Sequence, residues 1–231
     1  MSGVTAAARV AIVDYGVGNL FSVRQALLHA GLDAEISADR RAIAGAHGIV
    51  LPGIGAFGDA MDALRSLDLV DVLRGAAADG TPLIGVCLGE QLLMSESEEF
   101  GRHEGLGIVP GTVRRFPTGM RGEGRRNPLK VPQVGWNTLR PPSGRSWSAT
   151  ALDGLGSGDH VYFVHSFHVI PDDPAVVLSE TTYGDITYAS AIAAANVTAF
   201  QFHPERSGAV GLRIYENLAT SIKSAAGVGA P

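Results

Sequence analysis

The sequence holds one cysteine, Cys87, in 231 residues, so an internal disulfide framework and a cysteine-rich metal site are both excluded. Charge is modest: 18 lysines and arginines stand against 23 aspartates and glutamates, with no basic patch of the kind that binds nucleic acid. No apolar run approaches the length of a membrane span, and residues 1–9 lack the apolar core of a secretory signal. We therefore expect a cytoplasmic protein with no nucleic-acid or membrane partner.

Apolar residues make up 45% of the chain, and glycine is abundant at 30 residues. A chain of this length and apolar content can bury one sizeable core. No internal repeat or linker divides it, so we expect a single domain over residues 1–231.

The first half of the chain alternates strand and helix patterns. Four apolar runs predict buried strands, at residues 9–15, 33–37, 48–51 and 81–86. Two segments have helical spacing, 20–30 and 59–73, the second with a break near Asp68. This alternation predicts β-α-β units, and hence an α/β fold with a mixed, mostly parallel sheet flanked by helices. Such sheets carry their sites at the carboxyl ends of the strands.

The second half is richer in strand patterns and predicts a smaller additional β-sheet region. Single strands are expected at 112–116, 161–169 and 197–202. A hairpin is expected from 175–182 to 186–195, and a closing helix over 208–222. The composition of residues 119–127 is typical of an exposed, flexible loop.

Cys87 lies where the strand pattern 81–86 meets a helical pattern, with Gly85 and Gly89 flanking it at two residues on either side. This is the arrangement of a nucleophile elbow with sulfur in place of oxygen. The start of the helix favours a thiolate, and the backbone N–H of Leu88 is a natural oxyanion donor. A lone cysteine is more commonly a small buried hydrophobe, so the hypothesis needs a base.

His203 is the best candidate base, since it directly follows the last strand pattern. Side chains two residues apart on an extended segment share a face, so Glu205 is expected to hold the second ring nitrogen of His203. Together with Cys87 they would form a Cys–His–acid triad. The rival bases are His165 and His168.

No cofactor is expected. Gly16 and Gly18 match half of a dinucleotide fingerprint, but Phe21 stands where the third glycine would be. No cluster of histidine or cysteine has the spacing of metal ligands, so no metal site is expected either.

Two motifs taken together resemble the class I glutamine amidotransferases: residues 85–91 (GVCLGEQ) and 201–205 (QFHPE). Further stretches resemble the glutaminase subunit of imidazole glycerol phosphate synthase: 14–20 (DYGVGNL), 51–61 (LPGIGAFGDAM), 134–137 (VGWN) and 162–167 (YFVHSF). The likeness runs from about residue 9 to residue 222. It implies a flavodoxin-like architecture and one glutamine amidotransferase type 1 domain.

The resemblance implies that Cys87 attacks the carboxamide of L-glutamine, releasing ammonia and then glutamate. His203 would accept the thiol proton and later protonate the departing ammonia, with Glu205 orienting its ring. The oxyanion would lie against the N–H of Leu88 and a backbone N–H of the Gly53–Ile54 segment. The residues implied to hold glutamine are Gly53, Gly55, Gln91, His165, Ser166 and Phe167.

The resemblance also implies a partner, a (β/α)₈-barrel cyclase subunit that forms a heterodimer with the chain. Ammonia would pass to it through a tunnel, yielding imidazole glycerol phosphate and an aminoimidazole carboxamide ribotide in histidine biosynthesis. The glutaminase would be idle until the partner is loaded. The residues expected at the interface are Asp14, Tyr15, Asn19, Trp136, Asn137 and Arg206.

The chain departs from the family pattern at Glu90, where a methionine is usual. Its carboxylate would oppose a thiolate if it faced the site, and a surface orientation is the alternative. Three other departures are Gln133, Phe167 and Arg206 in place of histidine, tyrosine and lysine. The rival functions are a glutaminase serving a different, sugar-modifying synthase, a non-catalytic interaction subunit and a stand-alone thiol hydrolase.

Overall fold

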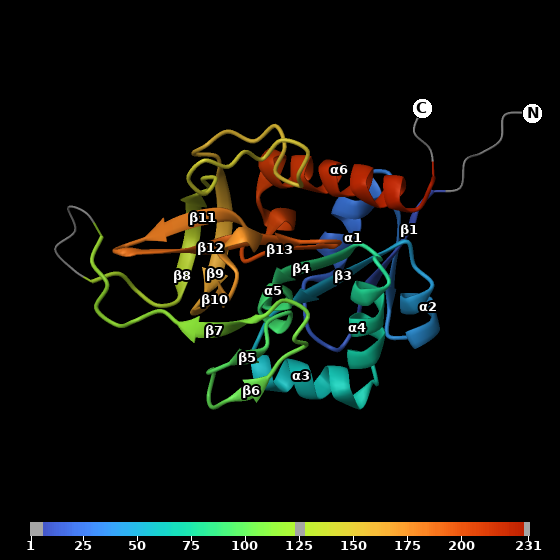
Figure 1. Ribbon diagram of the computed structural model, residues 1–231, viewed down its shortest axis with the longest axis horizontal. Helices are drawn as coiled ribbons and strands as arrows, with labels where there is room; N and C mark the ends of the chain where they lie inside the picture. Colours follow the sequence, from blue (N-terminus) through green and yellow to red (C-terminus); the bar gives the residue numbers. More distant parts are fainter. Residues whose placement is uncertain (1–6, 123–127, 229–231) are drawn as a thin grey trace, which may run out of the picture.

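The computed structural model describes residues 7–122 and 128–228. Its centre is a seven-stranded sheet with the order β11-β12-β13-β4-β3-β1-β2 (Figure 1). The strands from β13 to β2 run parallel, whereas β12 and β11 are each antiparallel to their neighbour. Their bounds are Arg9–Val13 (β1), Asp33–Ser37 (β2), Gly48–Gly53 (β3), Leu83–Cys87 (β4), Val177–Tyr183 (β11), Ile186–Ala194 (β12) and Val197–Phe200 (β13).

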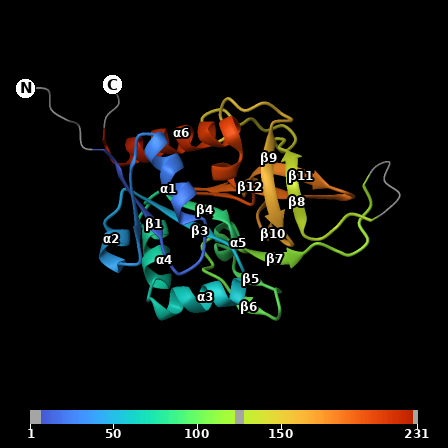
Figure 2. The ribbon, with the colours of Figure 1, turned by 180° about the vertical axis from the view of Figure 1, so that it is seen from behind.

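Helices cover both faces of this sheet (Figures 1 and 2). They are α1 (Leu20–His29), α2 (Arg40–Ala44), α3 (Phe57–Ser66), α4 (Val70–Ala78), α5 (Leu88–Leu92) and α6 (Gly208–Ala225). Two short 3₁₀ turns, η1 (Pro174–Val176) and η2 (Pro204–Arg206), lie in the second half.

The two cores follow the alternation of side chains along the strands. Val10 and Ile12 of β1 point to the face covered by α1 and α6, where they pack with residues such as Leu27 and Ile214. Ala11 and Val13 point to the other face and join residues contributed by α3 and α4. Both faces are therefore apolar, as expected for a mostly parallel sheet buried on both sides.

A smaller β-region lies beside the main sheet, as predicted (Figure 1). It consists of a four-stranded sheet, ordered β10-β7-β5-β6, and the two-stranded pair β8-β9. The bounds are Glu96–Ser97 (β5), His103–Glu104 (β6), Gly111–Arg115 (β7), Gln133–Thr138 (β8), His160–His165 (β9) and Phe167–Pro171 (β10).

The prediction of one strand over 161–169 was wrong. The segment divides at Ser166, so that β9 pairs with β8 and β10 pairs with β7. Both halves have the composition of a strand, so the sequence does not mark the division. The two halves differ only in the strand with which each one pairs. The change of sheet at Ser166 brings His165 and Phe167 to the edge of a pocket beside Cys87.

Other predictions agree better with the observed elements. The break near Asp68 is confirmed: Asp68 has φ +53° and lies between α3 and α4. The predicted hairpin corresponds to β11 and β12, and the closing helix extends to Ala225. The short elements α2, β5 and β6 and the strand β8 were not predicted. Residues 123–127 of the loop expected at 119–127 lie outside the described residues.

The register of three neighbouring strands positions the site. Gly53, at the end of β3, pairs with Cys87, at the end of β4. Phe200, at the end of β13, pairs with Val86 on the other side. The segments that follow these strands therefore emerge together, at the carboxyl edge of the sheet.

Candidate active site

Cys87 is the last residue of β4 and the N-cap of α5, with φ +55° and ψ −109°. Its flanking glycines leave no room for a side chain. A Cβ on Gly89 would lie 1.7 Å from the carbonyl oxygen of Leu51, and a Cβ on Gly85 would lie 2.9 Å from the Cβ of Ala199. The sharp strand-to-helix turn expected from the sequence is present, and these two close approaches explain its glycines.

His203 and Glu205 meet beside the elbow. Their atoms Nδ1 and Oε1 are 2.8 Å apart, and both side chains are almost fully buried. The predicted contact is present, but its geometric reason was wrong. His203 precedes the 3₁₀ turn η2, and this turn, rather than an extended strand, brings Glu205 back under the ring.

The charge of His203 is set by its two neighbours. Burial alone lowers its pKa, but the Cys87 thiol and the Glu205 carboxylate outweigh burial and raise that pKa to about 10. The ring is therefore an imidazolium at neutral pH. The other ring nitrogen, Nε2, is buried and forms no well-aligned hydrogen bond within the described residues, although the thiol is close enough to interact with the ring.

The rival histidines are held in neutral form. His165 Nδ1 lies 2.8 Å from the carbonyl oxygen of Phe167, and Nε2 lies 3.2 Å from the Tyr188 hydroxyl. Burial lowers the pKa of His165 to about 3 and that of His168 to about 4. His168 is stacked on the ring of Phe116 at 4.7 Å. Of the three candidate bases, only His203 contacts a carboxylate.

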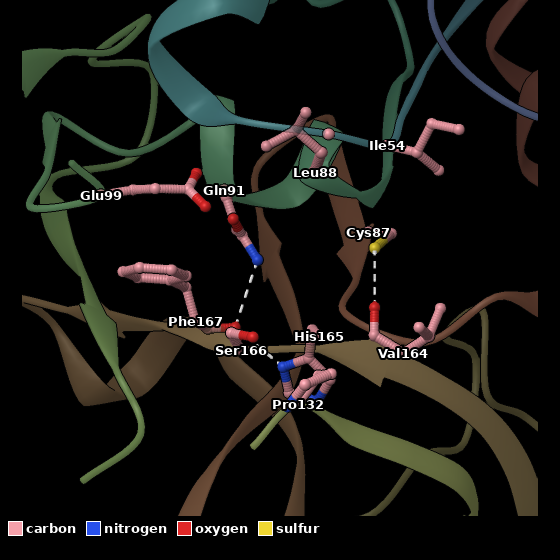
Figure 3. Close-up of a pocket in the computed structure, with 11 residues that line it drawn as sticks. Ile54, Cys87, Leu88, Gln91, Glu99, Pro132, Val164, His165, Ser166 and Phe167 are labelled. Atoms are coloured by element: carbon pink, nitrogen blue, oxygen red, sulfur yellow. Dashed lines mark hydrogen bonds between the residues drawn. The ribbon is translucent and has the colours of Figure 1, made fainter. Parts of the chain in front are cut away.

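A pocket of about 270 Å³ opens beside the thiol (Figure 3). It includes five of the six residues expected to hold glutamine and two of the three expected at the oxyanion. Its lining is Ile54, Gly55, Cys87, Leu88, Gln91, Glu99, Pro132, Val164, His165, Ser166 and Phe167.

Gly53 is the predicted substrate residue that does not line the pocket. It is buried behind the wall, where a Cβ would lie 2.2 Å from the Tyr15 hydroxyl and 2.9 Å from the Cβ of Leu88. The Tyr15 hydroxyl donates to the carbonyl oxygen of Pro52 at 2.7 Å. Gly53 thus lets the loop after β3 pack tightly against the elbow.

Tyr15 was expected at a docking surface, and that prediction was wrong: only 4% of the residue is exposed. Its phenol supports the loop after β3 from inside the molecule. The sequence could not show this, because Tyr15 follows a buried strand at a point where the chain could turn either way. Asp14 and Asn19 are half-buried nearby.

Two of the other expected interface residues, Trp136 and Arg206, lie beside Tyr162. Trp136 is 57% exposed, and its ring meets Tyr162 at 6.1 Å in an edge-on arrangement. The Arg206 guanidinium lies 5.4 Å from the centre of the Tyr162 ring. We call Trp136, Tyr162 and Arg206 the rim cluster. Tyr162 also lies 6.4 Å from His203, so the rim cluster adjoins the triad. Asn137 instead donates to the carbonyl oxygen of Thr182.

Glu90 does not face solvent, which settles the alternative left open by the sequence. Its side chain is fully buried on α5, and neither carboxyl oxygen has a hydrogen-bond partner within the described residues. Burial, followed by proximity to Cys87, raises the pKa of Glu90 well above its usual value. Its buried position beside the nucleophile therefore favours the protonated, uncharged form of the carboxyl group.

Glu99 is a pocket residue that the sequence reasoning missed. Its Oε2 accepts a hydrogen bond from the backbone N–H of Phe57 at 2.6 Å, at the start of α3. Burial raises its pKa, while that hydrogen bond and His103 act in the opposite direction. Figure 3 shows Glu99 and Cys87 at opposite ends of the pocket, with Gln91 between them. No local sequence pattern distinguishes Glu99 from the neighbouring glutamates as a pocket residue.

Among the described residues, no group of three or more histidines, cysteines or carboxylates could hold a metal ion. Over the same part of the chain, no helix is both long and apolar enough to cross a membrane.

The sequence and the fold both match known proteins. The family model for class-I glutamine amidotransferases matches residues 11–220. The chain is 48% identical to the imidazole glycerol phosphate synthase subunit HisH of Geobacillus thermodenitrificans, over 89% of this chain and 92% of that protein. It is 46% identical to HisH of Aquifex aeolicus, over 90% of this chain and 95% of that protein.

Solved structures support the fold alone. A chain in the structure of PurLQS from Thermotoga maritima superposes with a TM-score of 0.70 at 18% identity, covering 94% of this chain and all of that one. A structure described as a glutamine amidotransferase has a TM-score of 0.66 at 22% identity, covering 91% of this chain and 98% of its own.

The raised pKa of Glu90 predicts a pH-dependent stability. The folded state retains a proton that an unfolded glutamate releases above about pH 4.3, so the free energy of unfolding falls as the pH rises from there toward the raised pKa. The variant Glu90→Gln keeps the shape and removes this titration. We expect it to be more stable than the wild type above about pH 4.3, by an amount that grows as the pH rises toward the raised pKa of Glu90.

Thermal unfolding of both proteins across this range tests the prediction, with about 2–4 °C in Tm corresponding to each kcal/mol for a chain of this size. A difference in Tm that stays constant with pH would show that Glu90 is ionised in the folded state.

Proposed function

The chain belongs to the class-I glutamine amidotransferases, among the HisH subunits of imidazole glycerol phosphate synthase, and from this premise we propose which side chains carry out its chemistry. It is a glutaminase subunit of histidine biosynthesis, releasing ammonia from glutamine. The proposal rests chiefly on one observation: a buried histidine ring whose Nδ1 lies 2.8 Å from a buried carboxylate oxygen, next to a cysteine at the elbow of a strand and a helix.

In the proposed mechanism, the Cys87 thiolate attacks the carboxamide carbon of glutamine. The developing oxyanion is stabilised by the N–H of Leu88, at the start of α5, and by a backbone N–H of the Gly53–Ile54 segment. The His203 imidazolium then protonates the departing nitrogen, so that ammonia leaves as the C–N bond breaks.

The second half of the reaction uses the same groups in reverse. Neutral His203 takes a proton from water as the water attacks the glutamyl thioester, and the C–S bond breaks to return the thiolate and release glutamate. Glu205 holds Nδ1 throughout, which presents Nε2 to the reacting atoms. All of these groups follow β3, β4 or β13, so we propose that the chain acts as one catalytic domain.

The pocket supports an orientation for glutamine. The carboxamide end lies at Cys87 and the α-carbon end at Glu99, with the stem passing Gln91. Within the described residues, Glu99 uses only Oε2 in a hydrogen bond. Its Oε1 is free to accept from the α-ammonium group, while the backbone around Ser166 and Phe167 faces the α-carboxylate.

Ammonia must reach a second enzyme without escaping, which requires a partner over the site. We propose a (β/α)₈-barrel cyclase subunit that docks in a heterodimer on the rim cluster and the half-buried Asn19. Exposed aromatic and arginine side chains are typical of interface centres, and the rim cluster adjoins His203, where ammonia is protonated and released.

We expect Cys87→Ala to abolish glutamate release, because no other described side chain in the pocket is a comparable nucleophile. The assay compares the wild type and the variant, alone and with a cyclase barrel carrying its nucleotide ligand. The partnership predicts high activity only for the wild type in the loaded complex. Equal wild-type activity with and without the barrel would refute the gating, and activity retained in Cys87→Ala would refute the triad.

We expect Glu99→Gln to raise the KM for glutamine by about tenfold or more, because it removes the charge from a hydrogen bond to the α-ammonium group. The kcat should change little, since Glu99 lies at the far end of the pocket from the thiol. Steady-state kinetics of the loaded complex measure both constants. A fall in kcat at constant KM would contradict the proposed orientation of glutamine.

We expect Trp136→Ala to weaken binding of the cyclase barrel by at least about tenfold, as truncation of a central interface tryptophan does. Titration calorimetry measures the affinity. The control is Leu67→Ala, which removes a half-exposed leucine at the end of α3. In Figure 1, α3 lies apart from β8 and β9, the strands that carry Trp136 and Tyr162. Equal affinities for the two variants would place the interface elsewhere.

A further inference from the structure

A buried carboxamide contacts the nucleophile from within the protein. Gln201 directly follows β13, two residues before His203, and its side chain is fully buried. Its Nε2 lies 3.7 Å from Cys87 Sγ, within hydrogen-bond range for a sulfur acceptor. Its backbone N–H donates to the carbonyl oxygen of Ser190 at 3.0 Å, which ties this position to β12.

The neighbours of Gln201 determine which end of its amide faces the sulfur. Gln91 Nε2 donates to the carbonyl oxygen of Phe167 at 3.2 Å and to Gln201 Oε1 at 2.9 Å. A backbone carbonyl can only accept, so the NH₂ group of Gln91 must face Phe167. Gln201 therefore turns its oxygen toward Gln91, and its NH₂ group is left facing Cys87.

We propose that Gln201 is a positioning residue for the glutaminase reaction, whose amide N–H stabilises the Cys87 thiolate and is itself held in place by Gln91. This inference rests on the proposed role of Cys87 as the nucleophile. Gln91 also lines the glutamine pocket. One side chain therefore faces the substrate and fixes the hydrogen-bond donor of the nucleophile.

The N–H group of Gln201 stabilises the negative charge on the Cys87 sulfur and does not transfer its proton. An N–H group binds a thiolate more strongly than a neutral thiol, because hydrogen bonds to ionised acceptors are the stronger ones. The bond weakens when the C–S bond forms and the sulfur loses its charge. It strengthens again when water displaces the thiolate from the thioester, so it favours both the resting thiolate and its departure as a leaving group.

Three titratable groups face the thiol, one from each neighbouring segment. His203 follows β13 and is positively charged, because Cys87 and Glu205 outweigh burial and raise its pKa to about 10. Burial raises the pKa of Glu90 on α5 and of Tyr15 after β1, which favours the uncharged form of both. Removing the Gln201 amide changes none of these charges, so its loss reports on the donor alone.

The test is the rate at which iodoacetamide alkylates Cys87, measured against pH in the full-length chain. This readout requires neither glutamine nor the partner. Gln201→Met keeps the length of the side chain and removes the donor. We expect the rise in rate to move to higher pH, so that the rate on the rising part of the profile falls about tenfold at a given pH, the effect of losing one hydrogen bond to a charged acceptor.

The matched control is Gln133→Met. Gln133 is an equally buried glutamine, but its Oε1 accepts from the Tyr188 hydroxyl at 3.2 Å, and it makes no hydrogen bond to the sulfur. Its alkylation profile should follow the wild type. In the loaded complex, Gln201→Met should lower kcat about tenfold with KM within about twofold, as expected for a group that acts on the sulfur rather than on substrate binding.

A Gln201→Met variant that folds and keeps the wild-type alkylation profile overturns the inference. If Gln201→Met does not fold, Gln201→Asn takes its place, since it retains the carboxamide but withdraws it from the sulfur by one methylene. Cys87→Ala distinguishes a failure of the proposed glutaminase function from a failure of the proposed role of Gln201. Glutaminase activity in Cys87→Ala would refute the proposed function itself, whereas an inactive Cys87→Ala beside normal Gln201 variants would refute only the role of Gln201.

Discussion

The structure depends on the parallel pairing of β4 between β3 and β13. In that register the ends of the three strands are adjacent, so Cys87 emerges between the loop after β3 and the segment that carries His203. The turn at Cys87 is sharp enough that α5 passes against the backbone of β3, where only hydrogen fits at Gly89. The nucleophile, the loop behind it and the base are thus positioned by backbone pairing, and their side chains need little freedom of their own.

Burial determines which ionisable groups carry charge at the site. Away from water, a charged group is costly unless a partner compensates it. His203 has both the thiol and Glu205 as partners and is protonated, whereas His165 and His168 have none of opposite charge and are neutral. Glu90 has no hydrogen-bond partner among the described residues, and burial raises its pKa, which favours the protonated form. Histidines and acids of the same type therefore differ in charge because their surroundings differ.

Buried carboxamides connect the pocket to the nucleophile. Gln91 and Gln201 form a short series of hydrogen bonds from the carbonyl oxygen of Phe167 to the sulfur of Cys87. The series exists because β10 and the segment after β13 approach α5 from two sides. The smaller β-region therefore contributes more than a pocket wall, since its Phe167 carbonyl orients a group that acts on the thiol.

The sequence by itself determined the class of the fold, the elbow and the three residues that we propose as the triad. These features depend on local patterns: apolar runs at β-α-β spacing, glycines two residues from Cys87, and an acid two residues from His203. Only the tertiary structure decided the division of the strand at Ser166, the burial of Tyr15 and Glu90, the approach of Glu99 to the pocket and the approach of Gln201 to Cys87. Those outcomes depend on contacts between segments far apart in the chain, such as Gln91 with Gln201, and on which face each segment buries. The local sequence around such residues permits more than one environment, and packing selects among them.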